Sequence, residues 1–265
     1  MKGLFLAIQF LTVIPVWVDG KVTEKEIARS AAFFPLVGAL QGSIAALGAL
    51  LMARFFSPAI VSGLALFLLI AVNGGFHLDA LADTFDGIAV KSTGDAEADR
   101  RRRLSVMKDS ATGAIGVTAI VMAILLKYLF ISALFSGYGN GGAAYLIFLM
   151  AVFSKWSLTP ALFHGESARP DGLGRIFVEG ADWRSYVLSW VLLAAIALGA
   201  AWLWPSFSRA ARFRFLPLVC LCLYGFSVIW VFFCRRRFGG LTGDTAGAVA
   251  EVADLLFLAI ALLWF

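Results

Sequence analysis

The sequence predicts an all-α, polytopic integral membrane protein, a bundle of about seven transmembrane helices preceded by an amphipathic N-terminal segment. Of the 265 residues, 61% are hydrophobic, and the mean hydropathy is +0.88, which is far more apolar than a soluble domain. The apolar residues also gather in long runs that approach the length needed to cross a bilayer. We therefore expect a single integral membrane catalytic domain over residues 1–265.

The first element expected is a short helix within residues 1–17. This stretch has a basic start at Lys2 and an apolar middle, as a signal peptide has, but no small-x-small cleavage site follows it. A helix that lies at the membrane interface or dips into it fits the pattern better.

Apolar stretches then follow one another along the chain. The first contains Pro35 and Gly38, and the last begins inside a polar motif, so these two are the least regular of the expected spans. The stretches are 31–56, 58–76, 111–136, 143–163, 186–204, 214–234 and 245–265.

Three polar segments, 77–110, 164–185 and 235–245, fall on one side of the membrane in this arrangement. Most lysines and arginines lie on the same side, which the positive-inside rule identifies as cytoplasmic. This bias accounts for the net charge of +5, so we expect a lipid bilayer and no nucleic acid as partner. The expected location is the cytoplasmic (inner) membrane of a prokaryote, multi-pass, with the active site on the cytoplasmic side. Whether the chain forms a homo-oligomer is left open.

Three aspartates, Asp79, Asp83 and Asp86, directly follow the second apolar stretch. Their i, i+4, i+7 spacing places them on one face of a helix. Carboxylates crowded in this way repel one another, and a divalent cation with oxygen ligands offsets the repulsion. The spacing therefore predicts a Mg²⁺ or Mn²⁺ site, with His77 just before it as a candidate substrate-binding residue.

The segment 107–116 combines Lys108, Asp109 and Ser110 with Gly113 and Gly116. A basic residue, hydroxyls and glycines at the start of a helix are able to hold a phosphate on backbone N–H groups. A plain helix cap is the alternative interpretation.

The last apolar stretch carries acids of its own. Asp244 and Glu251 are spaced i, i+7, and Asp254 follows three residues later. Acidic residues inside a span are candidates for function.

Arg169 precedes a glycine-containing turn that suits an anion. Together, carboxylates for metal ions and cationic, glycine-rich segments for phosphate indicate transfer chemistry on a phosphoanhydride.

At these residues the chain resembles the cobalamin synthase family, the adenosylcobinamide-GDP ribazoletransferases. The resemblance rests on His-Leu-Asp-Ala-Leu-Ala-Asp-Thr-Phe-Asp-Gly at 77–87, on Arg-Leu-Ser-Val-Met-Lys-Asp-Ser at 103–110, and on Gly-Leu-Thr-Gly-Asp at 240–244. The family often has arginine at three places where this chain differs: it has Val13 and Ile14 between Thr12 and Pro15, Ala111 after Ser110, and Lys155 before Trp156. These departures weaken a phosphate-binding role for those positions.

The resemblance implies the last assembly step of vitamin B12, in which adenosylcobinamide-GDP and α-ribazole, or its 5′-phosphate, give adenosylcobalamin, or its 5′-phosphate, and GMP. It also implies Mg²⁺ as cofactor. The expected metal ligands are Asp79, Asp83, Asp86 and Asp244. The expected catalytic residues are Asp83, Asp86, Asp244 and Lys108. The expected substrate-binding residues are His77, Arg103, Lys108, Asp109, Ser110, Arg169, Thr242 and Glu251.

Two other functions fit parts of the pattern. A different Mg²⁺-dependent intramembrane transferase, of the prenyl or CDP-alcohol type, would also place spaced aspartates at a helix end. An ion-coupled transporter would use the acids as a cation pathway and the glycines as helix breaks.

Overall fold

The computed structural model describes residues 2–204 and 206–265, and this part of the chain contains helices and no β-strand. The predicted all-α membrane class is confirmed. The shorter helices are α1 (Lys2–Leu11), α2 (Glu24–Ser30), the 3-10 turn η1 (Ala31–Phe33), α6 (Ala96–Val106) and α8 (Leu173–Glu179). The longer ones are α3 (Phe34–Met52), α4 (Pro58–Asn73), α5 (Phe76–Ala89), α7 (Ala114–His164), α9 (Trp183–Leu203), α10 (Arg209–Phe238) and α11 (Gly243–Trp264).

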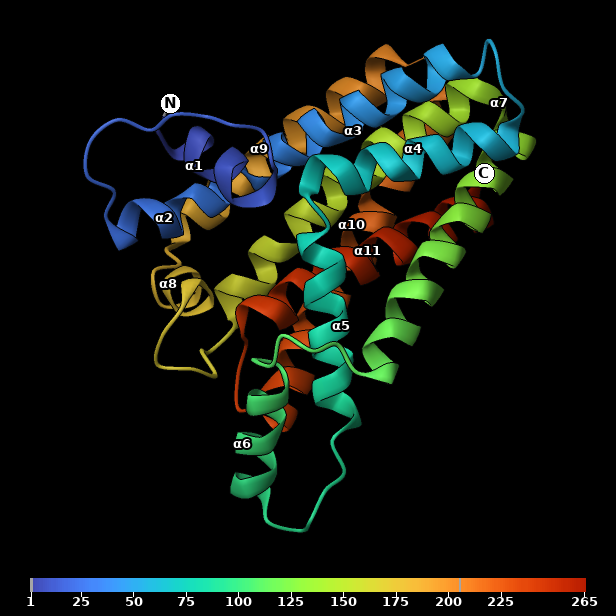
Figure 1. The fold of residues 1–265 in the computed structure, drawn as a ribbon. Coiled ribbons are helices and arrows are strands. Elements are labelled where there is room, and N and C mark those ends of the chain that lie inside the picture. Colours follow the sequence, from blue (N-terminus) through green and yellow to red (C-terminus); the bar gives the residue numbers. More distant parts are fainter. Residues whose placement is uncertain (1, 205) are drawn as a thin grey trace.

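Within the described residues, 5 helices are long and apolar enough to cross a membrane, and the number is 6 if the bent pair α4 and α5 forms one span. The 51-residue helix α7 joins two of the expected spans, 111–136 and 143–163, in one element. Gly139, with φ 66° and ψ 179°, breaks its helical geometry, and the chain changes direction along α7 in Figure 1. Each half of α7 exceeds the roughly 20 residues that a span needs. With the two halves counted separately and the bent pair counted as one span, the segments number seven, as expected.

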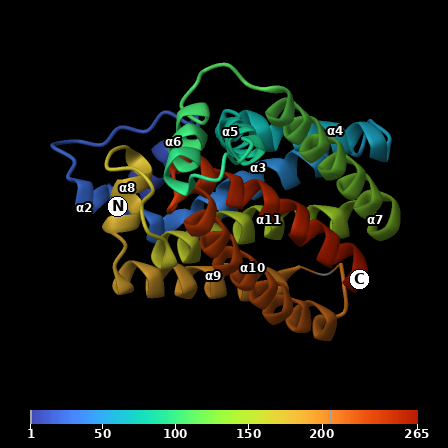
Figure 2. The ribbon, with the colours of Figure 1, turned by 90° about the horizontal axis from the view of Figure 1, so that it is seen from below.

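The second half of α7 forms the centre of the bundle. Almost every residue from Gly142 to Leu162 is buried, as expected for a helix that is apolar around its whole circumference. Helices α3, α4, α9, α10 and α11 pack around α7. Viewed from below, α9 and α10 cover one side of the molecule while α5 and α6 stand on the other side of α11 (Figure 2).

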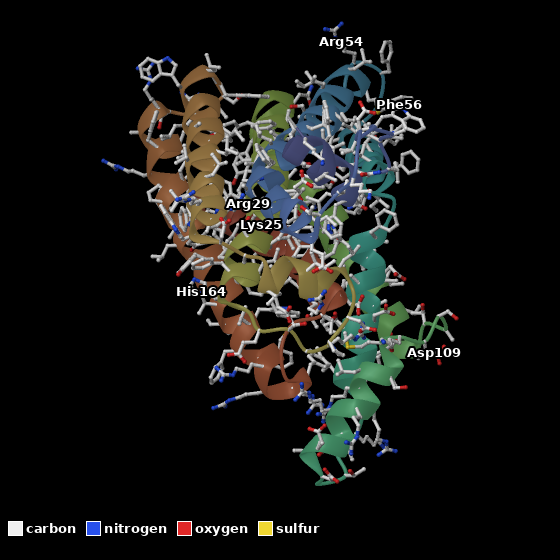
Figure 3. All side chains as sticks on the ribbon, turned by 90° about the vertical axis from the view of Figure 1, so that its left-hand side faces the viewer. Lys25, Arg29, Arg54, Phe56, Asp109 and His164 are labelled. Atoms are coloured by element: carbon white, nitrogen blue, oxygen red, sulfur yellow. The ribbon has the colours of Figure 1, made fainter. Side chains whose placement is uncertain are left out.

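The N-terminal helix α1 packs on the outside of the bundle against α2 and α3. Its buried residues are Leu6, Ala7 and Leu11, so the expected amphipathic N-terminal helix is present. The polar segments gather toward one end of the molecule. Figure 3 places Arg54 and Phe56 at one end of the long helices and Asp109 toward the opposite end.

Candidate active site

The turn between α4 and α5 sets the direction of the aspartate-bearing helix. Gly74 and Gly75 have left-handed φ values of 68° and 74°, a conformation that favours glycine because it has no Cβ. The side-chain oxygen of Asn73 accepts a hydrogen bond from the N–H of Gly75 at 2.8 Å. As a result α5 leaves α4 at an angle of 86° and packs against α11. The apolar stretch expected over 58–76 thus corresponds to α4 and the turn that follows it.

Carboxylates from α5 and α11 meet because these two helices pack closely. A Cβ added to Gly247 on α11 would lie only 2.6 Å from the Cβ of Ala80 on α5. Asp244 lies in the first turn of α11. Asp83 lies close enough to Asp244 and Asp79 for their negative charges to act on its carboxylate. The packing of α5 against α11 thus places Asp244 near Asp79 and Asp83, which come from a segment far away in the sequence.

Arg169 is held beside this acidic group by its loop. The N–H of Ala168 donates to the carbonyl of Leu241 at 2.8 Å, and the N–H of Leu241 donates to the carbonyl of Glu166 at 2.7 Å. This pairing ties the 166–172 loop to the start of α11. The guanidinium of Arg169 lies 3.4 Å from the carboxylate of Asp244, so a cation faces the carboxylates across the site.

Thr242 is the N-cap of α11. Its hydroxyl accepts a hydrogen bond from the N–H of Thr245 at 3.1 Å, and the hydroxyl of Thr245 accepts one from the N–H of Thr242 at 2.8 Å. The Thr242 hydroxyl also lies 3.3 Å from the carboxylate of Asp244, to which it donates. The cap therefore orients Asp244, and it stabilises the helix end by about 1 kcal/mol.

A cavity of about 540 Å³ opens beside these residues. Its polar lining comes largely from α5, from the 166–172 loop and from the start of α11, and it includes His77, Asp79, Arg169, Asp171, Thr242 and Asp244. Aromatic residues line it as well: Phe10, Phe34, Phe76 and Phe177. His77 is only 6% exposed, and its Nδ1 has no hydrogen-bond partner among the described residues. A cavity of this size and mixed lining is typical of a small-molecule site.

Asp86 makes contacts that its spacing did not predict. One carboxylate oxygen accepts a hydrogen bond from the N–H of Gly113 at 2.7 Å, and the other accepts one from Gly116 at 2.8 Å. These are unpaired donors at the start of α7, and a carboxylate also suits the positive end of the helix dipole. Asp86 therefore links α5 to α7. Sequence spacing placed Asp86 with the other aspartates but did not predict this cap.

The expected phosphate segment lies at the rim of the cavity. The Nζ of Lys108 is 3.9 Å from the carboxylate of Asp171, which lines the cavity, and both side chains are largely exposed. Asp109 accepts a hydrogen bond from the N–H of Ala111 at 3.1 Å and shapes the turn. Ser110 is exposed. Neither Asp109 nor Ser110 lines the cavity.

Arg103 does not reach the cavity. Its guanidinium is buried, donates to the carbonyl of Arg237 at 3.2 Å and lies 3.8 Å from Asp99. Arg237 in turn donates to the carbonyl of Ile88 at 2.7 Å. Because the two arginines are used to dock α6 onto the ends of α10 and α5, the structure supports a structural role for Arg103 in place of the expected substrate contact.

Glu251 is likewise absent from the cavity lining. It is 2% exposed, and its carboxylate lies 2.6 Å from the Nζ of Lys127, which also lies 2.5 Å from Asp254. Lys155 lines the same small internal space. In the structure Glu251 is therefore part of a buried ion pair, and its expected substrate contact stays a prediction. Sequence reasoning missed Lys127, although a lone lysine in the middle of an apolar stretch was the available signal.

The carboxylates of the site suit a hard divalent cation in their chemistry. Asp83 lies near the carboxylates of Asp244, Asp79 and Asp86. Arg169 supplies positive charge beside Asp244, so the acids outnumber this cation. Oxygen ligands of this kind are those that Mg²⁺ prefers. In the arrangement observed, no three His, Cys, Asp or Glu side chains of the described residues are grouped closely enough to hold a metal ion.

Comparison with known proteins places this geometry in a family. The family model described as cobalamin-5-phosphate synthase matches residues 3–262. An adenosylcobinamide-GDP ribazoletransferase of Thermodesulfovibrio yellowstonii is 36% identical over 97% of this chain and 95% of its own length. The proteins of that name from Geotalea daltonii and Listeria monocytogenes are each 35% identical, over 97% and 100% of this chain and over 96% and 99% of their own lengths. No solved structure matches the chain.

These matches cover the cavity, both acid-bearing helices and the arginine loop, so they relate the whole of the described site to those enzymes. The chain belongs to the cobalamin-5-phosphate synthase family.

Proposed function

We propose that this protein joins adenosylcobinamide-GDP to α-ribazole, or to its 5′-phosphate, and releases GMP. The observation that carries the proposal is family membership over residues 3–262, together with the cavity in which Asp79, Asp244 and Arg169 meet. Family membership favours this transfer over the prenyltransferase and transporter alternatives.

The reaction breaks a phosphoanhydride bond and forms a phosphate ester bond. A ribose hydroxyl of α-ribazole attacks the phosphorus nearer the cobinamide, the bond from that phosphorus to the oxygen of GMP breaks, and GMP leaves with the electron pair. The hydroxyl proton passes to a carboxylate of the site. Asp83 and Asp244 are the candidates. Asp244 lies 3.4 Å from Arg169, Asp83 lies near Asp244, and a carboxylate in such a place is able to serve as general base.

Arg169 supplies fixed positive charge to this site. Its loop is tied to α11 by backbone hydrogen bonds, so its guanidinium is already in position before substrate binds. A preorganised cation stabilises the charge of the diphosphate without a cost in reorganisation. Lys108, at the rim beside Asp171, adds a second positive charge where GMP leaves.

Asp79, Asp83 and Asp244 would hold Mg²⁺, and Asp86 serves as the cap of α7. When bound, Mg²⁺ neutralises charge on the diphosphate oxygens. The remaining chemistry belongs to the residues named above: they position the hydroxyl, accept its proton and balance the charge on GMP.

The membrane location of the site completes the proposal. The long apolar helices make the chain a multi-pass membrane protein, and we place the chain in the cytoplasmic membrane of a prokaryote. The site would face the cytoplasm, since the polar segments that build it hold most of the lysines and arginines.

The test is turnover by detergent-solubilised protein with both substrates and Mg²⁺, following GMP release and cobalamin formation. Asp79→Asn, Asp244→Asn and EDTA treatment should each reduce turnover by about 100-fold or more. Asp19→Asn, at an exposed loop position outside the cavity, is the matched control and should stay at the wild-type rate. Well-folded wild-type protein without turnover would rule the proposal out.

A further inference from the structure

One wall of the cavity is built from three aromatic rings that come from separate helices. Phe10 lies on α1, Phe34 on α3 and Phe177 on α8. The ring centroids of Phe10 and Phe177 are 4.6 Å apart, those of Phe34 and Phe177 are 5.7 Å apart, and Phe10 and Phe34 are nearly parallel at 6.1 Å. We call Phe10, Phe34 and Phe177 the aromatic wall.

The aromatic wall faces a cavity that also holds the transfer site. All three rings line the same space as Asp79 and Asp244. Phe34 and Phe177 are almost fully buried, whereas Phe10 is 37% exposed. Phe10 therefore retains open ring surface, which is what a stacked ligand requires.

We propose that the aromatic wall is the subsite for the planar base of α-ribazole, and this inference rests on the proposed function. A nucleoside has a flat base at one end and ribose hydroxyls at the other. A base stacked on the wall leaves its ribose free to extend toward the carboxylates. The cavity thus has the two kinds of surface that one nucleoside needs.

The polarity of the wall favours this base over guanine, the other planar base in the reaction. Guanine has several hydrogen-bond donors and acceptors on its edges, and burying them without partners is costly. Of the hydrogen-bonding side chains that line the cavity, Gln9 precedes Phe10 on α1, and Arg175 lies on α8 with Phe177. Arg175 already donates to Glu179 and Glu24. The dimethylbenzimidazole base of α-ribazole has methyl groups and no exocyclic donors, so an apolar aromatic wall suits it.

The size of the cavity points the same way. A volume of about 540 Å³ is in the range that holds one drug-sized molecule. The nucleoside is that small, whereas the corrinoid substrate is several times larger. Only the diphosphate region of the corrinoid needs to reach Asp244 and Arg169, so most of that substrate stays outside.

Phe10→Ala tests the proposal without opening the core, because Phe10 is partly exposed. Phe5→Ala is the matched control: Phe5 lies on the same helix, is 38% exposed and does not line the cavity. Phe10→Tyr keeps the ring and should keep binding. The readout is the Kd for α-ribazole alone, measured by calorimetry in detergent, with size-exclusion profiles to check folding.

Phe10→Ala should raise the Kd for α-ribazole about 10-fold or more, while Phe5→Ala and Phe10→Tyr stay near the wild-type value. The KM for adenosylcobinamide-GDP should not change in any of them. An unchanged Kd in Phe10→Ala would overturn the proposal. A raised KM for adenosylcobinamide-GDP with an unchanged Kd for α-ribazole would also overturn it and would assign the wall to guanine.

The binding measurement separates this inference from the proposed function. Wild-type protein that binds α-ribazole through Phe10 but shows no turnover would leave the subsite in place and remove the transfer reaction. Wild-type protein that turns over both substrates with no loss in Phe10→Ala would leave the reaction in place and remove the subsite.

Discussion

Replacing Lys127 with methionine removes the cation that two buried carboxylates share. The Nζ of Lys127 lies 2.6 Å from Glu251 and 2.5 Å from Asp254, and all three side chains are almost fully buried. Methionine has a similar length and suits an apolar interior, so the variant changes charge far more than packing.

The expected loss follows from the charge left behind. Removing one partner of a buried ion pair costs about 3–5 kcal/mol, because the other charge then stays buried without compensation. Two carboxylates lose a partner here, but Lys155 lines the same internal space and still compensates one of them. We therefore expect the free energy of unfolding to fall by about 3–5 kcal/mol and not by twice that amount. A loss of this size lowers Tm by on the order of 10 °C.

Thermal unfolding of detergent-solubilised protein, followed by tryptophan fluorescence, measures this change. Lys91→Met, at an exposed position, is the control and should leave Tm unchanged. Adding Glu251→Gln to Lys127→Met leaves one acid, Asp254, opposite one base, Lys155, and should recover most of the loss. The reasoning is refuted if Lys127→Met is as stable as the wild type, or if the double variant is less stable than the single one.

Three further predictions concern a helix cap, a helix–helix contact and a buried carboxylate. Asp86→Ala removes the hydrogen-bond acceptors at the start of α7. It should lower the free energy of unfolding by about 1–2 kcal/mol and speed amide exchange in that turn. If the variant instead shifts the Mg²⁺ concentration that gives half-maximal turnover, Asp86 is a metal ligand. Gly247→Ala should separate α5 from α11 and reduce turnover at least 10-fold. Adding Ala80→Gly should restore turnover, since the two positions are in contact. Unchanged turnover in Gly247→Ala would contradict the close packing. Hydrogen bonds from Ser92 and then Thr93 lower the pKa of Asp99 to about 2. Its contribution to stability should therefore be complete above about pH 4 and be lost as pH falls toward 2, and Asp99→Asn should abolish this part of the pH–stability profile.

Much of the fold was predictable because it depends on local properties. The apolar runs identify the membrane helices, and the spacing of Asp79, Asp83 and Asp86 identifies one helix face. Hydropathy does not determine how a span bends. It therefore did not predict the 86° angle after Gly74 and Gly75. It did separate the stretches 111–136 and 143–163, and the kink at Gly139 lies between them.

The sequence by itself determined the membrane class, the order of the helices and the residues able to carry transfer chemistry, because length, polarity and spacing suffice for these. Only the tertiary structure decided which polar groups face each other. Asp244 and Glu251 are two turns apart on one helix, yet Asp244 meets Arg169 in the cavity and Glu251 meets Lys127 in the interior. The spacing of residues on a helix specifies which face they share, whereas the charge opposite each of them depends on the neighbouring helix, and that neighbour is set by packing across the whole bundle.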